Sequence, residues 1–197
     1  MRPKLFVVTG PSGAGKGTLI RRLVERREDL AAAVSATTRP LRPGEQDGRE
    51  YHFLSEEEFL RGIRAGDFLE HVSYVSGHRY GTLRREVERI TASGRSCVLE
   101  LETQGAKEVK AAEPDAVTIF VEAPGFDELE RRLRERATES AGEIGERLTL
   151  ARRQAEEAGD FDRVVTNDDL GRAVAELGAI VDAAVGEPSA AGKLRAP

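Results

Sequence analysis

The feature that most constrains the fold is a glycine-rich loop at residues 10–18, set between an apolar run and a helical pattern. Residues 5–9 read Leu-Phe-Val-Val-Thr, which is typical of a strand buried on both faces. The loop reads Gly-Pro-Ser-Gly-Ala-Gly-Lys-Gly-Thr, and residues 16–27 follow with apolar side chains at helical spacing. This succession of strand, loop and helix predicts a site for the phosphates of a nucleoside triphosphate.

The spacing of Gly10, Gly15 and Lys16 suits that chemistry. Glycines accept positive φ and let backbone N–H groups point inward around phosphate oxygens. The helix that begins after the loop adds unpaired N–H groups, and the Lys16 ammonium reaches the terminal phosphates. The residues expected to bind the triphosphate are Gly10, Pro11, Ser12, Gly13, Ala14, Gly15, Lys16, Gly17 and Thr18.

One position of the loop departs from the usual pattern. A serine or threonine that binds Mg²⁺ commonly follows the lysine, whereas this chain has Gly17. Thr18 is the candidate metal ligand one residue later, and Mg²⁺ held through water and phosphate oxygens is the alternative.

The rest of the chain alternates between strand and helix patterns, which predicts an α/β fold with a parallel sheet covered on both faces. Further strands are expected at residues 32–35, 97–101, 117–121 and 163–166, and further helices near 83–93, 126–136, 143–157 and 170–185. Residues 51–82 differ, being short, aromatic-rich and interrupted by glycines. We expect them to form an insertion with short antiparallel strands and one helix that starts near Ser55. A mobile link is expected at residues 137–142, and a disordered tail at 186–197.

Composition excludes several function classes. The net charge of −5 argues against general affinity for nucleic acid or anionic membranes. Cys97 is the only cysteine and there are three histidines, so neither a disulfide nor a cysteine- or histidine-based metal site is expected. No signal peptide and no membrane-spanning run is recognisable, and we expect a cytoplasmic protein.

A second group of residues suggests a site for another anion. Arg39 and Arg42 stand three apart in a polar loop, and Tyr51 follows shortly. Two guanidinium groups and a phenol suit a phosphomonoester, although each residue taken singly could be an exposed charge or a packed aromatic. Glu70 and Tyr80 lie in the same unusual insertion.

Together these segments resemble the guanylate kinase family. The segment from Ser35 to Tyr51 resembles the GMP-binding signature of that family, and Gly17-Thr18 is an accepted variant of its phosphate loop. Phe68-Leu69-Glu70, Tyr80-Gly81-Thr82, residues 99–105 and Thr166-Asn167-Asp168-Asp169 resemble further family blocks in the same order. The resemblance covers residues 5–185. It implies a P-loop core at 1–34 and 83–185 with a helical lid at about 126–158, a GMP-binding insertion at 35–82, and transfer of a phosphoryl group from ATP to GMP with Mg²⁺.

The resemblance also implies roles for individual positions. The phosphate of GMP would be held by Arg39, Arg42, Tyr51 and Tyr80, and guanine would be read by Ser35, Glu70 and Thr82. Catalysis would use Lys16, Arg39 and the lid arginines Arg132, Arg136 and Arg147, with Asn167 near the adenine of ATP. Glu102 stands where the family commonly has Asp and would be a further hydrogen-bond acceptor toward guanine. Glu100, at the end of a predicted buried strand beside the phosphate loop, is a further candidate of the substrate site and would orient Mg²⁺ through water.

Glu70 also has an argument of its own. Guanine presents N1–H and the N2 amino group side by side, so one carboxylate can accept both hydrogen bonds, whereas adenine offers no such edge.

The sequence departs from the guanylate kinase pattern at three places. These are Glu102, Ala137 in place of a lid glycine, and one extra residue between Tyr74 and Gly77.

Two other functions remain open at this point. The first is a kinase for another small acceptor, such as AMP or a sugar phosphate. The second is a non-catalytic module of the guanylate kinase type that binds phosphorylated partners. No nucleic acid or membrane partner is expected, and a monomer and a homodimer are both compatible with the sequence.

Overall fold

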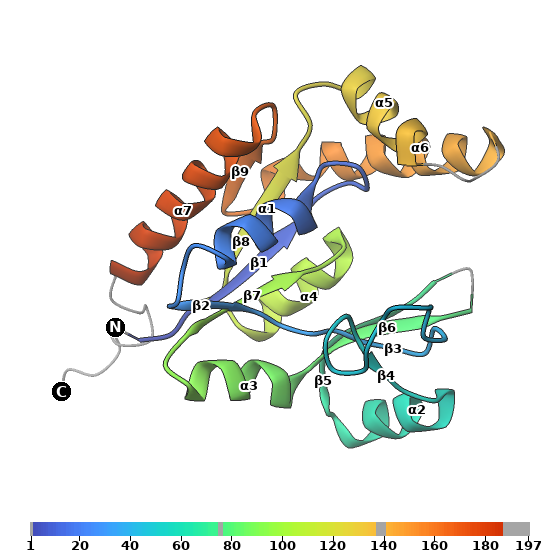
Figure 1. Ribbon diagram of the computed structural model, residues 1–197, viewed down its shortest axis with the longest axis vertical. Helices are drawn as coiled ribbons and strands as arrows, with labels where there is room; N and C mark the ends of the chain where they lie inside the picture. Colours follow the sequence, from blue (N-terminus) through green and yellow to red (C-terminus); the bar gives the residue numbers. More distant parts are fainter. Residues whose placement is uncertain (1, 75–76, 137–140, 187–197) are drawn as a thin grey trace.

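The centre of the molecule is a five-stranded parallel sheet (Figure 1). The structure is a computed structural model in which residues 2–74, 77–136 and 141–186 are described. The strands lie in the order β2 (Leu30–Ala32), β7 (Ser96–Glu100), β1 (Leu5–Thr9), β8 (Val117–Glu122) and β9 (Arg163–Thr166). Every neighbouring pair in this sheet is parallel, which confirms the predicted α/β class.

Helices cover both faces of the sheet because its strands carry apolar side chains on both sides. Helices α1 (Lys16–Val24) and α7 (Leu170–Gly186) cover one face, and α3 (Arg84–Ala92) and α4 (Thr103–Ala112) cover the other. Strand β1 serves both cores, since Phe6 and Val8 point to the first and Val7 to the second. These residues are fully buried, so the strand that leads into the glycine-rich loop is fixed from both sides.

A second, four-stranded sheet lies beside the first. Its strands lie in the order β4 (His52–Phe53), β3 (Ala36–Thr37), β6 (Arg79–Leu83) and β5 (Phe68–Ser73). The expected helix is α2 (Glu56–Ala65), which starts at Ser55 with the Ser55–Glu58 capping box. Its Phe59 is buried and stacks on Phe68 of β5 with ring centroids 4.3 Å apart. The expectation of antiparallel strands holds for β3–β6 and β5–β6, but the β3–β4 pair is parallel.

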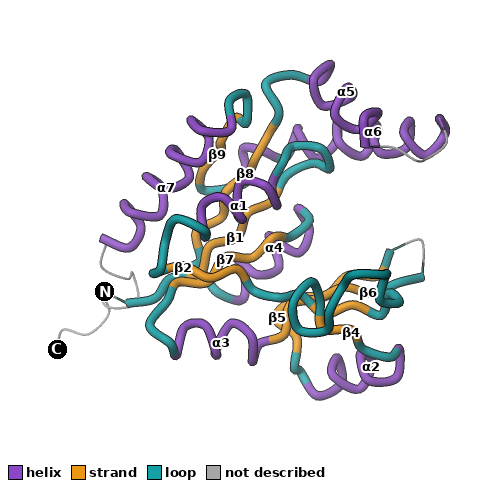
Figure 2. The backbone as a smooth tube through the Cα atoms, in the orientation of Figure 1, coloured by secondary structure: helices purple, strands orange, loops and turns teal. Residues whose placement is uncertain are grey.

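Two helices after β8 pack against each other. Helices α5 (Phe126–Arg136) and α6 (Ala141–Glu156) share a small core of Leu129, Leu133 and Ala151, and the 3-10 helix η1 (Ala158–Asp160) follows. Figures 1 and 2 place α5 and α6 above the loop after β1, with the small sheet below it. Two arms of the molecule therefore extend from the carboxyl ends of the central strands.

Two predicted boundaries differ from the structure by more than two residues. The first helix ends at Val24 rather than residue 27, because Arg27 belongs to a turn in which it bonds Asp29 and Asp182. The second strand lies at Leu30–Ala32 rather than 32–35, because Leu30, which is buried, anchors it beside β7. The chain then leaves this sheet and enters β3 of the small one.

Helix α4 was not predicted. Its buried residues Thr103, Ala106 and Val109 recur at helical spacing, but Gly105 in the first turn and the shortness of the segment obscured the pattern. Of the expected link at 137–142, residues 137–140 lie outside the described residues, and 141–142 already belong to α6. Of the expected tail, Gly186 ends α7 and residues 187–197 lie outside the described residues.

Gly10, where β1 turns into the loop, is required by close approach of the backbone. Its φ is +133°, and a Cβ at this position would lie 2.1 Å from the carbonyl oxygen of Val121 in β8. That distance is far inside van der Waals contact, so any side chain would push β1 and β8 apart.

Gly10→Ala should therefore lower the free energy of unfolding by more than about 3 kcal/mol in urea titration, since strain and overlap add. Gly94→Ala is the matched control, because Gly94 also has positive φ but has open space around it. The control should cost about 1 kcal/mol. Equal losses in the two variants would contradict the role of close approach at Gly10.

Candidate functional site

A cavity of about 1010 Å³ lies between the carboxyl ends of the central strands and the small sheet. Predicted site residues that line it are Ser12, Gly13, Gly15, Lys16, Gly17, Thr18, Ser35, Tyr51, Glu70, Tyr80, Glu100 and Glu102. Other lining residues, which the sequence did not single out, include Arg21, Glu50, Tyr74, Gln104 and Gly105. The fold thus brings most of the predicted triphosphate and acceptor residues to one hollow.

The glycine-rich loop has the backbone shape that phosphate binding requires. Gly13 and Gly15 have φ of +87° and +92°, and helix α1 begins immediately afterwards at Lys16. The Lys16 ammonium donates to the carbonyl oxygens of Gly10 at 2.7 Å and Pro11 at 3.2 Å. The ammonium is therefore held against the loop itself, close to the place where terminal phosphates would lie.

Neighbouring elements press closely on this loop. A Cβ at Gly13 would come within 3.1 Å of the Leu129 and Leu133 side chains of α5. A Cβ at Gly15 would lie 2.4 Å from the amide nitrogen of Asn167, which donates to the Ala14 carbonyl at 2.7 Å. Asn167 thus fixes the back of the loop by a hydrogen bond.

Gly17 lies next to the side chain of Glu100. A Cβ at position 17 would lie 3.0 Å from Oε2 of Glu100, which is the far end of a flexible and exposed side chain, so a serine or threonine fits after a small shift of that carboxylate. Glu100 ends β7 beside the loop, and Thr18 comes next in α1 and lines the cavity. Among the described residues no group of three or more His, Cys, Asp and Glu side chains could hold a metal by itself. One carboxylate and one hydroxyl, completed by water and phosphate oxygens, nevertheless form a set that suits Mg²⁺.

Glu70 is a buried carboxylate at the edge of the cavity. Its side chain belongs to β5, and the residue is 6% exposed. The Thr82 hydroxyl donates to Oε1 at 2.8 Å, while Oε2 faces Gly105, whose Cβ would lie 3.0 Å from it. Gly105 therefore leaves the room that this oxygen needs. Burial raises the pKa of Glu70, and the Thr82 hydrogen bond opposes that rise.

Three tyrosines form one wall of the cavity. The Tyr80 ring lies edge-on to Tyr51 at 5.8 Å and to Tyr74 at 5.2 Å between centroids. Burial raises the pKa of Tyr51, so its phenol remains a neutral hydrogen-bond donor around pH 7. Tyr74 was not predicted, because nothing in the sequence around it distinguishes it from a packed aromatic.

The two arginines predicted to hold a phosphate lie beside the cavity and not in its lining. The Arg39 guanidinium is bound by both oxygens of Glu45, at 3.0 and 2.8 Å, and lies 5.4 Å from the centre of the Tyr51 ring. Arg42 is exposed, and its backbone N–H donates to the same Glu45 carboxylate at 2.8 Å. The Glu45 contact was not foreseen.

A smaller cavity of about 340 Å³ opens on the other side of the loop. Arg132 and Asn167 line it together with Gly13, Gly15 and Thr18. The Arg132 guanidinium bonds Glu128 at 2.7 Å and the Asn167 carbonyl at 3.0 Å. Arg136 ends α5 and Arg147 lies in α6, but their side chains lie outside the described part of the chain.

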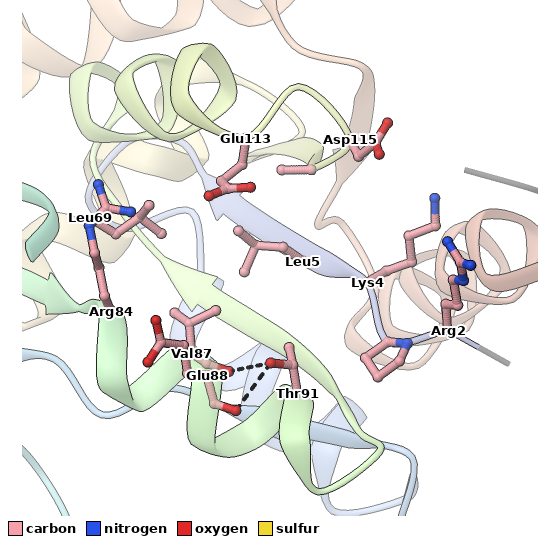
Figure 3. A pocket seen from close by; sticks show the side chains of 12 residues that line it. Arg2, Lys4, Leu5, Leu69, Arg84, Val87, Glu88, Thr91, Glu113 and Asp115 are labelled. Carbon is pink, nitrogen blue, oxygen red and sulfur yellow. Dashed lines mark hydrogen bonds between the residues drawn. The ribbon is translucent and has the colours of Figure 1, made fainter. Parts of the chain in front are cut away.

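A third hollow, of about 320 Å³, lies at the amino end of β1, away from the loop. Figure 3 shows Leu5 between Val87 of α3 and Glu113 at the end of α4, with Arg84 and Glu88 nearby. The predicted site residues do not line this hollow, and its charges are mixed in sign. We therefore place the chemistry at the two cavities around the glycine-rich loop.

The sequence comparisons with known proteins agree on one family. The guanylate kinase family model matches residues 2–184. A guanylate kinase of Rubrobacter xylanophilus is 52% identical over 176 residues, which cover 89% of this chain and 92% of the relative. One of Frankia casuarinae is 48% identical over 177 residues, covering 90% and 96%.

Solved structures give the same fold. The crystal structure of guanylate kinase from Anaplasma phagocytophilum matches with a TM-score of 0.76 and 28% identity, covering 94% of this chain and 87% of that one. A shikimate kinase of Bacteroides thetaiotaomicron, at 17% identity and a TM-score of 0.51, covers 91% and 98% and shares the fold alone. Within the described residues, no helix has the length and apolar character needed to cross a membrane.

The burial of Glu70 predicts a cost in stability that depends on pH. Because its pKa is higher in the folded than in the unfolded chain, the fold loses stability as pH rises through the interval between the unfolded-state and folded-state pKa, and the loss is complete above the folded-state pKa. Glu70→Gln should therefore raise the melting temperature at neutral pH, and the difference should vanish as pH falls below the ordinary pKa of a glutamate. Thermal melts from pH 4 to 8 would test this. A variant that is less stable at neutral pH would contradict it.

Proposed function

This chain belongs to the guanylate kinase family, and we propose that its large cavity holds GMP while the glycine-rich loop holds the triphosphate of ATP. The reaction is the transfer of the γ-phosphoryl group of ATP to GMP, which gives ADP and GDP. The observation that carries the choice of acceptor is the buried carboxylate of Glu70 at the cavity edge.

Glu70 suits guanine because it offers two oxygens at a desolvated position. Guanine donates from N1–H and the N2 amino group, and one carboxylate accepts both hydrogen bonds. Adenine would leave the buried charge unpaired, which is costly in a site shielded from water. Thr82 orients the carboxylate, and Ser35 lies in the same lining and contributes a further hydroxyl toward the base.

The GMP phosphate is assigned to the wall formed by Tyr51 and Tyr80, with Arg39 and Arg42 beside it. Arg39 is held by Glu45, and a phosphate monoester with its higher charge and three oxygens competes well against one carboxylate for a guanidinium. We infer that the loop carrying both arginines closes on the phosphate when GMP binds.

ATP is assigned to the loop and to the smaller cavity. Backbone N–H groups around Gly13 and Gly15 and the Lys16 ammonium hold the phosphates, and the adenine lies toward Asn167. Glu100 and Thr18 would hold Mg²⁺ with water and phosphate oxygens, and the ion would neutralise charge on the transferring group.

Catalysis then rests on position and charge. The transition state is loose and spreads charge over the equatorial oxygens, so cations that converge on them stabilise it. Lys16 is held at the loop and Arg39 lies on the acceptor side. The lid arginines Arg132, Arg136 and Arg147 are proposed to complete the set of cations around the transferring group. No strong general base is required, because the acceptor is already a phosphate anion. Closure of the lid and the insertion excludes water, which would otherwise accept the phosphoryl group.

We propose a cytoplasmic location for this reaction, because Cys97, the single cysteine of the sequence, is a free and buried thiol. Both a monomer and a homodimer are compatible with this assignment, because the site is built from one chain.

Rates of ADP formation with GMP, AMP, CMP and UMP test the acceptor. GMP should exceed the others in kcat/KM by at least about 100-fold. Glu70→Gln should lower kcat/KM for GMP by about 10- to 100-fold, since a charged hydrogen-bond acceptor is lost, and should raise kcat/KM for AMP, since the buried charge that disfavours adenine is removed.

Glu50→Gln is the matched control, because Glu50 also lines the cavity but has no assigned part in reading the base. It should change kcat/KM for GMP by less than about threefold. AMP or another acceptor used as well as GMP by the wild type would overturn the proposed function.

A further inference from the structure

The lid helix α6 sends one polar side chain to the edge of the acceptor cavity. Gln154 is 5% exposed, and its side-chain amide donates to Oε2 of Glu102 at 2.8 Å. Glu102 lines the cavity, whereas Gln154 does not. The hydrogen bond therefore joins the lid to a carboxylate that faces the acceptor.

The backbone position of Glu102 leaves its side chain available for this purpose. Glu102 is the N-cap residue of α4, but its side chain makes no capping hydrogen bond. A glutamate side chain has one more rotatable torsion than an aspartate. Its carboxylate therefore needs a hydrogen-bond partner from another residue to keep one orientation. Gln154 supplies such a partner from α6, and Tyr74, which directly follows β5, interacts with the same carboxylate.

Ion pairs join the carboxyl-terminal end of the lid helix α6 to α4, close to the Gln154–Glu102 hydrogen bond. The Lys107 ammonium of α4 pairs with Glu157 and Asp160, each at 2.8 Å, just beyond the end of α6. The helix that begins at Glu102 is thereby tied to the chain that follows Gln154. The donor amide is thus held in a fixed position relative to the carboxylate it contacts.

The chemical type of the partner also matters. An arginine or lysine would pair with Glu102 and compete with the N–H groups of an incoming base. A neutral amide directs one carboxylate oxygen and leaves the negative charge in place. Such an arrangement suits a carboxylate that must still accept hydrogen bonds from a substrate.

We propose that Gln154 is a positioning residue for acceptor recognition, holding Glu102 in the direction from which it accepts from the amino group of guanine. This inference rests on the proposed function, because it requires that the cavity hold GMP. It makes the lid helix part of the acceptor site as well as the donor site, so that α6 contributes to the affinity for GMP before any phosphoryl transfer.

Steady-state kinetics of Gln154→Met test the proposal, because methionine keeps the length and apolar stem of the side chain but cannot donate. KM for GMP should rise about five- to tenfold, with KM for ATP and kcat within about twofold of the wild type. Ala155→Met is the matched control, since it adds the same side chain at an exposed neighbour on α6. It should leave all three constants unchanged.

A double-mutant cycle with Glu102→Ala separates positioning from general loosening of the lid. In the Glu102→Ala background, Gln154→Met should have less than about a twofold further effect on KM for GMP, because the group it orients is gone. Gln154→Glu offers a second variant of native length. It should raise KM for GMP more than methionine does, since two carboxylates would face each other.

An unchanged KM for GMP in Gln154→Met, an equal rise in KM for ATP, or full additivity with Glu102→Ala would overturn the inference. The wild type in the same assay keeps the two proposals apart. If it fails to phosphorylate GMP, the proposed function fails. If it does phosphorylate GMP and Gln154→Met behaves like the control, only the role of Gln154 fails.

Discussion

The parallel register between β1 and β7 determines where every group of this site lies. Val8 pairs with Glu100, and the Leu101 N–H donates to the Val8 carbonyl at 3.0 Å. The glycine-rich loop and the acidic segment Glu100–Glu102 therefore leave the sheet at the same level and on adjacent strands. A shift of one residue would move Glu100 away from Gly17 and turn buried side chains of β7 toward the wrong face. The apolar cores on both faces hold this register.

Much of this arrangement follows from local sequence signals. The apolar run at 5–9, the glycines of the loop and the Ser55–Glu58 capping box each determine structure through their immediate neighbours. The guanine-reading role proposed for Glu70 came from the resemblance to the guanylate kinase family, and the match between one carboxylate and the N1–H and N2 edge of guanine supports it. What the sequence did not reveal depends on contacts between distant segments. No local sequence pattern indicates three of these contacts. They are the hydrogen bond between Gln154 and Glu102, the position of Glu100 beside Gly17, and the packing of α4 against Glu70.

Several features of the site lower the stability of the fold. Glu70 is buried as a carboxylate, and Gly13, Gly15 and Gly105 give up side chains so that other groups can approach. Arg39 is held by Glu45 beside the tyrosine wall, which keeps a cation near the acceptor in a protein of net charge −5. Recognition of an anion that carries a guanine base would account for these features together.

The most direct measurement of this claim is a crystal structure of the protein with GMP bound. The N1–H and N2 edge of guanine should lie within about 2.7–3.2 Å of the Glu70 carboxylate, and the phosphate should lie against Tyr51 and Tyr80. Glu102 should lie beside the N2 amino group with its bond to Gln154 intact. Guanine bound instead in the smaller cavity, beside Asn167 and Leu170, would contradict the division into acceptor and donor sites.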